Sequence, residues 1–212
     1  MTKGIARRGI GSRSGIGRKP IASAYGYTTA QTPYFYGSGT HTFTTPKSGY
    51  WKFVLWGAGG GGSSAGPGGS GGYVEVTKYL LGNSTVALTV SYPLYASGGS
   101  GTITSTTATF PDGTVCTATR GGVNVAGTAS GGDVNLNGSV NTAGLGTNGG
   151  AANNGSGAPA NLPFIGGAGG VSSVGPADTN NGRAPGGGGA AMSGADLCAG
   201  GAGQIVALFL RE

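Results

Sequence analysis

The sequence contains little charge, one histidine and only two cysteines. Asp, Glu, Lys and Arg make up 8% of its 212 residues, whereas hydrophobic residues make up 37%. Ordinary soluble domains carry about 25% charged residues, and disordered chains usually stay soluble through charge. A chain this poor in charge has to bury its apolar segments. We therefore expect a folded chain that associates with other subunits, including copies of itself as a homo-oligomer.

The scarcity of ionisable side chains also argues against catalysis and metal binding. His41 lies in a threonine-rich segment without a G-x-S-x-G motif, and one histidine with two distant cysteines cannot make a structural zinc site. The acids are isolated from one another along the chain. We predict that the protein is not an enzyme and needs no cofactor or metal, and that Cys116 and Cys198 are free, buried thiols.

One glycine motif resembles a nucleotide-binding loop but lacks its context. Residues Gly57–Gly62 fit the pattern G-x-G-x-x-G and follow an apolar run. A dinucleotide site needs a helix to begin there, so that the helix N-terminus faces the pyrophosphate. The following residues, SSAGPGGSGG, cannot form a helix, and no acid stands about twenty residues further on. The motif is therefore not interpreted as a cofactor site.

Long apolar runs are missing as well. No run approaches the roughly 20 apolar residues of a membrane helix, and the N-terminus lacks the apolar stretch of a secretory signal. We expect no membrane insertion, and assembly in the cytoplasm.

The positive charge is concentrated at the N-terminus. Residues 1–24 form a basic arm, the first acid of the chain is Glu75, and the residues after position 20 are neutral overall. Such an arm on a neutral body is typical of docking onto an acidic surface or nucleic acid, and the alternative is a solvated tail. The candidate anchoring residues are Lys3, Arg7, Arg8, Arg13, Arg18 and Lys19.

An aromatic linker, residues 25–39, follows the arm. Large aromatic side chains dominate the energetics of protein interfaces, so these could contact a neighbouring subunit; packing on their own domain is the equal alternative. They are Tyr25, Tyr27, Tyr34, Phe35 and Tyr36.

The body, residues 40–212, is expected to be an all-β domain. Runs rich in β-branched and aromatic residues are bounded by turn residues, and no window has a sustained helical period. The turn Pro111-Asp112-Gly113 predicts a hairpin, and 204–210 is expected to be a central strand covered on both faces. The other expected strands are 41–44, 50–56, 73–77, 85–90, 102–110 and 114–119.

Three glycine-rich insertions separate these strands. They are 57–72, 121–170 and 175–203, and the first holds ten glycines in sixteen residues. Glycine at this density stays ordered only if the backbone groups find partners. Extended helices with three residues per turn, as in polyglycine II, would provide them because glycine lets backbones approach closely. The alternative is that the insertions are flexible loops.

Two blocks of the chain resemble the glycine-rich domains of bacteriophage tail fibres and related spike-type virion proteins. The first, Thr42–Gly62 (TFTTPKSGYWKFVLWGAGGGG), has a Phe-Thr-x-Pro turn and a strand ending in Trp-Gly-Ala before a glycine run, and Gly71–Val74 follows as a second element. The block Pro185–Leu210 is similar to the family's closing glycine loop and last strand. The resemblance covers 40–90 and 185–212, and covers 100–184 in composition only.

The resemblance implies a β-sandwich, jelly-roll-like, that is oligomeric on the virion and often serves host attachment. The sequence departs from the family at residues 91–97 (SYPLYAS) and in its basic arm, which favours a short spike rooted in a capsid over a long fibre. The arm would then contact capsid or tail proteins or, non-specifically, packaged nucleic acid.

Attachment would use the glycine insertions, whose backbone amides and polar side chains can bind host polysaccharide or an outer-membrane receptor. The candidate receptor-facing residues are Asn137, Asn141, Asn148, Asn153, Asn154, Asn180 and Asn181. Two alternatives stay open: a capsid decoration protein without a receptor role, and a secreted glycine-rich adhesin or matrix subunit.

Overall fold

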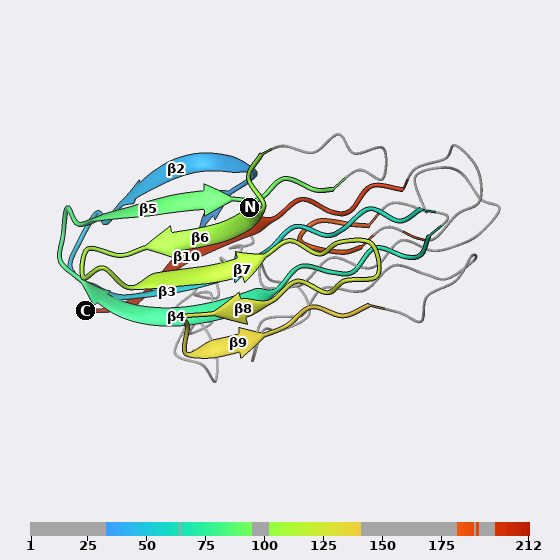
Figure 1. Cartoon of the computed structure of the whole chain (residues 1–212). Helices are drawn as coiled ribbons and strands as arrows, with labels where there is room; N and C mark the ends of the chain where they lie inside the picture. Colours follow the sequence, from blue (N-terminus) through green and yellow to red (C-terminus); the bar gives the residue numbers. More distant parts are fainter. Residues whose placement is uncertain (1–32, 64, 95–101, 141–181, 189, 191–197) are drawn as a thin grey trace, which may run out of the picture. The chain divides into compact units, whose positions relative to one another are not determined.

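The structure is a computed structural model that describes residues 33–63, 65–94, 102–140, 182–188, 190 and 198–212 (Figure 1). The chain divides into two units, Met1–Ala30 and Gln31–Glu212. The first unit lies outside the described residues, so the description concerns the second.

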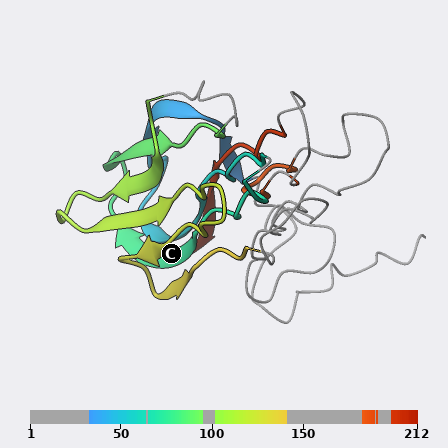
Figure 2. The same cartoon turned by 45° about the vertical axis from the view of Figure 1, so that its right-hand side comes forward.

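The described chain folds into two antiparallel five-stranded sheets. Sheet A has the order β1-β10-β3-β4-β9 and sheet B the order β2-β5-β6-β7-β8 (Figures 1 and 2). The strands of sheet A are β1 (Tyr34–Tyr36), β10 (Gln204–Arg211), β3 (Gly49–Trp56), β4 (Tyr73–Leu80) and β9 (Val134–Leu136). Those of sheet B are β2 (Gly39–Thr44), β5 (Thr85–Val90), β6 (Ser105–Thr109), β7 (Val115–Thr119) and β8 (Ala129–Ser130).

The core lies between the sheets and is rich in aromatic rings. Alternate residues of β3 point inward, so Trp51 and Phe53 meet Phe43 from sheet B at ring centroid distances of 5.0 and 5.6 Å. Both pairs have the edge-to-face geometry that aromatic rings prefer. Val86, Leu88 and Val90 of β5 complete the facing layer, along with other apolar residues. The expected β-sandwich is confirmed.

Part of the outer face of sheet A is also buried. Val54, Trp56, Tyr73 and Val206 point away from the core cluster, yet none of them is exposed. This explains why β3 and β10 are almost continuously apolar, and it confirms the expected central strand at 204–210.

A buried ion pair lies on the same outer face. The ammonium group of Lys52 is 2.5 Å from a carboxylate oxygen of Glu75, and the side chains are 13% and 6% exposed. The Tyr73 hydroxyl donates a further hydrogen bond to Glu75. A buried carboxylate is tolerated when it is paired and hydrogen-bonded in this way.

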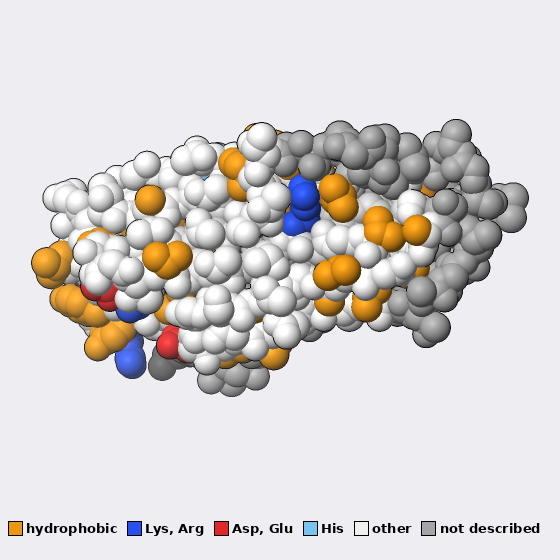
Figure 3. Space-filling model, viewed as in Figure 1, with side chains coloured by type: hydrophobic (Ala, Val, Ile, Leu, Met, Phe, Trp, Pro, Cys, Tyr) orange, Lys and Arg blue, Asp and Glu red, His pale blue; other side chains and the backbone are white. Residues whose placement is uncertain are grey.

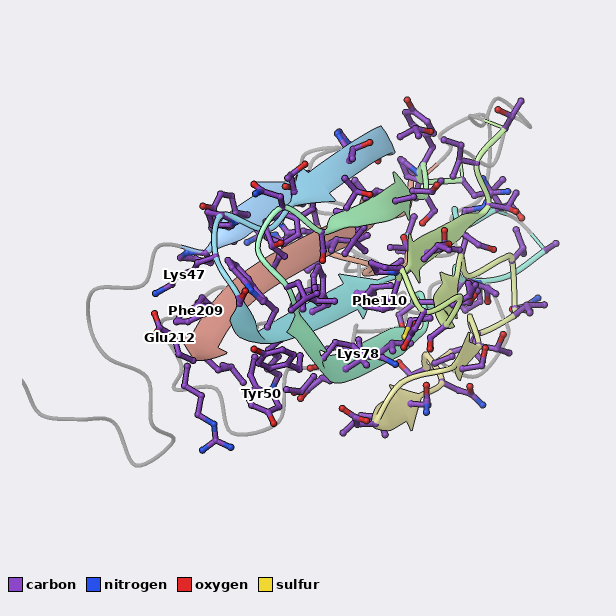
Figure 4. All side chains as sticks on the ribbon, turned by 90° about the vertical axis from the view of Figure 1, so that its left-hand side faces the viewer. Lys47, Tyr50, Lys78, Phe110, Phe209 and Glu212 are labelled. Atoms are coloured by element: carbon purple, nitrogen blue, oxygen red, sulfur yellow. The ribbon has the colours of Figure 1, made fainter. Side chains whose placement is uncertain are left out.

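The turn between β6 and β7 confirms the predicted hairpin. Gly113 takes a positive φ of 81°, and the Asp112 carboxylate accepts hydrogen bonds of 2.9 Å from the Thr114 backbone and from the Lys78 ammonium. The Lys78 ammonium also lies 5.7 Å from the centre of the Phe110 ring (Figure 4). These contacts connect the hairpin to β4.

Most expected strands occur at the expected positions, and no helix occurs among the described residues. Three short strands were not foreseen. β1 lies in the aromatic linker, and β8 and β9 lie in the tract 121–170, which was interpreted as an insertion. Each is only two or three residues long, too short for a periodic signal.

Replacing Lys52 with Met should destabilise the protein by about 3–5 kcal/mol, because Glu75 would remain buried without its cation. Urea unfolding followed by circular dichroism measures the change. Lys47→Met is the control: Lys47 forms a 3.7 Å pair with Glu212, with side chains 51% and 80% exposed (Figure 4), and such a pair contributes about 0–1 kcal/mol. Equal losses in both variants would contradict the structural role of the buried pair.

The Lys78 hydrogen bond, followed by those from Thr114, lowers the pKa of Asp112 from 3.8 to about 2. Because the folded-state pKa lies below the unfolded one, the stabilisation is present above about pH 4 and is lost as the pH falls toward 2. An NMR titration of the Asp112 carboxyl carbon in folded protein should have its midpoint near 2. Lys78→Met should shift the midpoint upward, and an unshifted midpoint near 4 in the unmodified protein would contradict the assignment.

Candidate functional site: the glycine bundle

The glycine-rich segments extend from one end of the sandwich and lie side by side (Figures 1 and 2). We call them the glycine bundle. It comprises residues 57–63, 65–72, 120–127, 138–140, 182–188 and 198–203. Apart from isolated bridges, these segments do not pair as strands. Their buried backbones are nevertheless extensively hydrogen-bonded.

Successive residues of the segment 69–72 donate hydrogen bonds in three directions. The amides of Gly69, Ser70 and Gly71 donate to the carbonyls of Gly122, Ser139 and Gly186, at 2.8–2.9 Å. The next amide, Gly72, returns to the first neighbour and donates to Thr119 at 3.0 Å. A β-strand alternates between two directions, so this period of three identifies the polyglycine-II-like arrangement expected as one alternative for the insertions.

The segment 57–62 follows the same rule. Gly57 and Gly60, three residues apart, donate to Gly72 and Gly69 at 2.9 and 2.8 Å. Gly59 and Gly62 donate to the other side, to Gly201 and Cys198, at 2.8 and 2.9 Å. These amides donate to protein carbonyls and are therefore not available to bind a phosphate.

The segments are too close together for side chains at several positions. A Cβ atom on Gly59 would overlap the carbonyl of Gly187, one on Gly71 would overlap that of Gly57, and one on Gly188 would overlap that of Gly68. The glycines therefore permit close backbone approach.

Two buried hydroxyl side chains connect the bundle to the sandwich. The Thr106 hydroxyl donates to the Trp56 carbonyl at 2.8 Å, and the Ser91 Oγ lies 2.9 Å from the Thr106 Oγ1. Ser91 Oγ also accepts a 2.8 Å hydrogen bond from the amide of Ala58, where the bundle begins. Because Ser91 and Thr106 are fully buried, this connected network favours one orientation of the first bundle segment.

The far end of the described bundle has two interlocked turns. Ser63 and Gly66 exchange backbone hydrogen bonds, and Gly122 and Val125 do the same. Asn124 joins the turns: its side-chain amide donates to Ala65 and its backbone amide donates to Pro67, both at 2.8 Å. Its φ of 56° lies in the left-handed region that Asn tolerates. Asn124 was not singled out from the sequence.

Residues of the bundle also form hydrogen bonds with residues that flank three segments outside the described residues, namely 95–101, 141–181 and 191–197. Leu94, before 95–101, accepts a 3.1 Å hydrogen bond from Gly200, and Gly182, after 141–181, donates 2.8 Å to Ala199. Cys198, after 191–197, accepts from Gly62. Leu94 also donates a 3.2 Å hydrogen bond to Gly59. Because all of these contacts involve residues 59–62 or 198–200, the three flanking residues lie close together.

The aromatic residues that were predicted as subunit contacts have different surroundings in the structure. Tyr34 packs on Phe43 at 5.2 Å, and Tyr36 packs on His41 at 5.3 Å, so both contact their own domain. Phe35 points to the opposite face of sheet A and is 52% exposed, which leaves it available to a neighbour.

The remaining predicted site residues fall into two groups. Asn137 is described and exposed, and its side-chain oxygen accepts a 3.1 Å hydrogen bond from Ala129 beside the bundle. The others lie outside the described residues: Lys3, Arg7, Arg8, Arg13, Arg18, Lys19, Tyr25, Tyr27, Asn141, Asn148, Asn153, Asn154, Asn180 and Asn181.

Within the described residues, no three His, Cys, Asp or Glu side chains gather where they could hold a metal. Cys116 and Cys198 are both buried and free, as expected, and burial raises the pKa of the Cys116 thiol to about 11. In the same part of the chain, no helix is long and apolar enough to cross a membrane. The described bundle contains no acidic side chain, and its basic side chains are Arg120 and Arg183.

No protein-family model and no curated protein sequence matches the chain.

Gly59→Ala should destabilise the protein by about 1–3 kcal/mol or more, because its Cβ would force the segments 57–62 and 182–188 apart. Thermal unfolding of the full chain measures the loss. Gly37→Ala is the matched control, since nothing lies within 4 Å of a Cβ there. If both variants unfold at the same temperature, the bundle is not closely packed.

Proposed function

We propose that the protein is a structural component of a bacteriophage particle, a short spike- or fibre-type projection that takes part in host attachment. The proposal joins the resemblance of Thr42–Gly62 and Pro185–Leu210 to such virion domains with the architecture of the described chain. Its central support is the glycine bundle, a charge-poor, hydrogen-bonded scaffold that brings together one flank of each of the segments 95–101, 141–181 and 191–197 at one end of the sandwich.

The direction of β1 supports an anchored projection. β1 pairs antiparallel with β10, with Tyr34 opposite Ala207 and Tyr36 opposite Ile205. The strand thus runs toward Gln204 and the bundle, and Tyr34 lies at its end away from the bundle. We propose that attachment uses the bundle, and that the basic arm, which precedes β1 in the sequence, serves anchoring.

Attachment through the bundle would suit a neutral partner. Loops on a rigid scaffold tolerate changes in length and sequence, which is useful for a surface that recognises a variable receptor. The described bundle has one basic side chain in 182–188, Arg183, and one in 120–127, Arg120, and no acid. Host polysaccharide or an outer-membrane receptor is therefore the proposed partner.

Deleting residues 2–19 should prevent incorporation into particles while leaving the β-domain folded. A second variant, with Lys3, Arg7, Arg8, Arg13, Arg18 and Lys19 replaced by Gln, separates the charge of the arm from its length and should also fail to incorporate. Immunoblots of purified particles measure incorporation, and circular dichroism checks the fold. Normal incorporation of both variants would contradict anchoring by the basic arm.

Particles that lack the protein distinguish attachment from capsid decoration. We expect them to adsorb poorly to host cells and to keep their heat resistance. Normal adsorption with lost heat resistance would instead establish a decoration protein, and finding the native protein on cells that make no particles would favour an adhesin.

A further inference from the structure

The outer face of sheet B carries an uninterrupted row of hydroxyl groups across all five strands. Strand register places Thr40 opposite Thr89, Thr89 opposite Thr107, Thr107 opposite Thr117, and Thr117 opposite Ser130. These residues alternate with core residues such as Phe43, Leu88 and Ala108, so they share the face that points away from the core. We call this row the hydroxyl ladder.

The rest of this face is equally free of charge. Its other outward positions are also Thr or Ser, except for Ala87 and Val115; they are Thr42, Thr44, Thr85, Ser105, Thr109 and Thr119. Figure 3 shows the surface over sheet B as mostly uncharged and polar, with charge confined to one end and to a basic patch next to the bundle. Threonine is favoured in strands for its β-branched shape, and the distinguishing feature of this face is that no charged side chain interrupts the hydroxyls at these outward positions.

Of the ladder residues, Thr40 and Ser130 are exposed, and Thr89, Thr107 and Thr117 are half-buried. Among the hydrogen bonds of the described chain, none involves the side chains of Thr40, Thr89, Thr107, Thr117 or Ser130. Threonine is β-branched and stiff about its first side-chain torsion, so binding restricts little further motion. Each hydroxyl can both donate and accept.

From this geometry we infer that the hydroxyl ladder binds an extended, uncharged polysaccharide that lies across the strands. Nucleic acid, acidic polymers and charged lipid headgroups would find no opposite charge along the ladder, and an apolar partner would have to desolvate the hydroxyls without replacing their hydrogen bonds. A neutral glycan offers complementary hydroxyls. The ladder repeats at the strand spacing of about 4.8 Å, close to the advance of one sugar ring in an extended β-linked chain.

This inference rests on the proposed attachment function and specifies its ligand class, but it assigns binding to sheet B and not to the glycine insertions. The two surfaces would be complementary: the insertions could vary with the receptor, whereas the ladder would recognise only the repeat and neutrality of a polymer. Weak individual hydrogen bonds would add up along the five strands.

The test is affinity electrophoresis of the full-length protein in native gels that contain one defined polysaccharide each. A neutral β-linked glucan and a galactomannan should retard the protein. Dextran, which is neutral but α-linked, should retard it much less. No retardation by either neutral β-linked polymer would overturn the inference.

A triple ladder variant tests which residues bind the glycan. It removes three neighbouring hydroxyls and keeps side-chain shape and strand preference; its substitutions are Thr89→Val, Thr107→Val and Thr117→Val. Its affinity for the neutral glucan should fall about tenfold or more. The control Thr44→Val/Thr77→Val/Thr85→Val removes three exposed hydroxyls outside the ladder and should change affinity less than twofold. Equal affinities of the two triple variants would contradict the ladder as the site.

Sedimentation velocity of the same proteins tests whether a second copy covers this face. The triple ladder variant should sediment as the unmodified protein does, and a changed oligomeric state would show that the ladder is a contact between copies, which overturns the inference.

Glycan binding is measured on purified protein and incorporation on particles. Failure of ladder binding therefore leaves the virion role intact, and absence from particles leaves the binding result intact.

Discussion

Close backbone approach between glycine segments is the constraint on which the rest of the structure depends. Gly59, Gly71 and Gly188 lie where any side chain would overlap a neighbouring carbonyl, and the amides of 69–72 donate to three different neighbours in turn. The conformational entropy that glycine loses in an ordered segment is offset by hydrogen bonds that are nearly all backbone to backbone. Composition typical of a disordered chain thus produces a packed scaffold.

The sandwich makes this bundle possible because it fixes where each segment starts. β3 leads directly into 57–62 and 198–203 leads directly into β10, while Ser91 and Thr106 hold the junction through buried hydrogen bonds. The aromatic core supplies the hydrophobic stabilisation that the bundle lacks. The charge-poor bundle at one end of the sandwich, and the basic arm that precedes β1 in the sequence, support the proposal of an anchored projection that binds neutral partners.

The sequence revealed the parts of this architecture that depend on local pattern. The strands at 50–56 and 204–210 were predictable from their apolar and β-branched residues, and the Pro111-Asp112-Gly113 turn identified its hairpin. Features set by distant pairing were not predictable: β1 exists because Tyr34–Tyr36 meets β10, and the Lys52–Glu75 pair requires the register of β3 and β4. Asn124 and the hydroxyl ladder likewise gain meaning only from neighbours remote in sequence. Of the predicted site residues, Tyr34 and Tyr36 pack on their own domain, Phe35 is exposed, and the arm lies outside the described residues.

Amide hydrogen exchange tests the central claim, a hydrogen-bonded glycine bundle, most directly. Exchange followed by mass spectrometry on the full chain compares the peptides covering 57–63 and 65–72 with those covering β3. If the bundle exists as described, the amides of Gly57, Gly60, Gly69 and Gly72 exchange as slowly as those of β3, because their hydrogen bonds open only when the domain unfolds. Exchange of these glycine peptides at the rate of an unstructured chain, with β3 still protected, would contradict it.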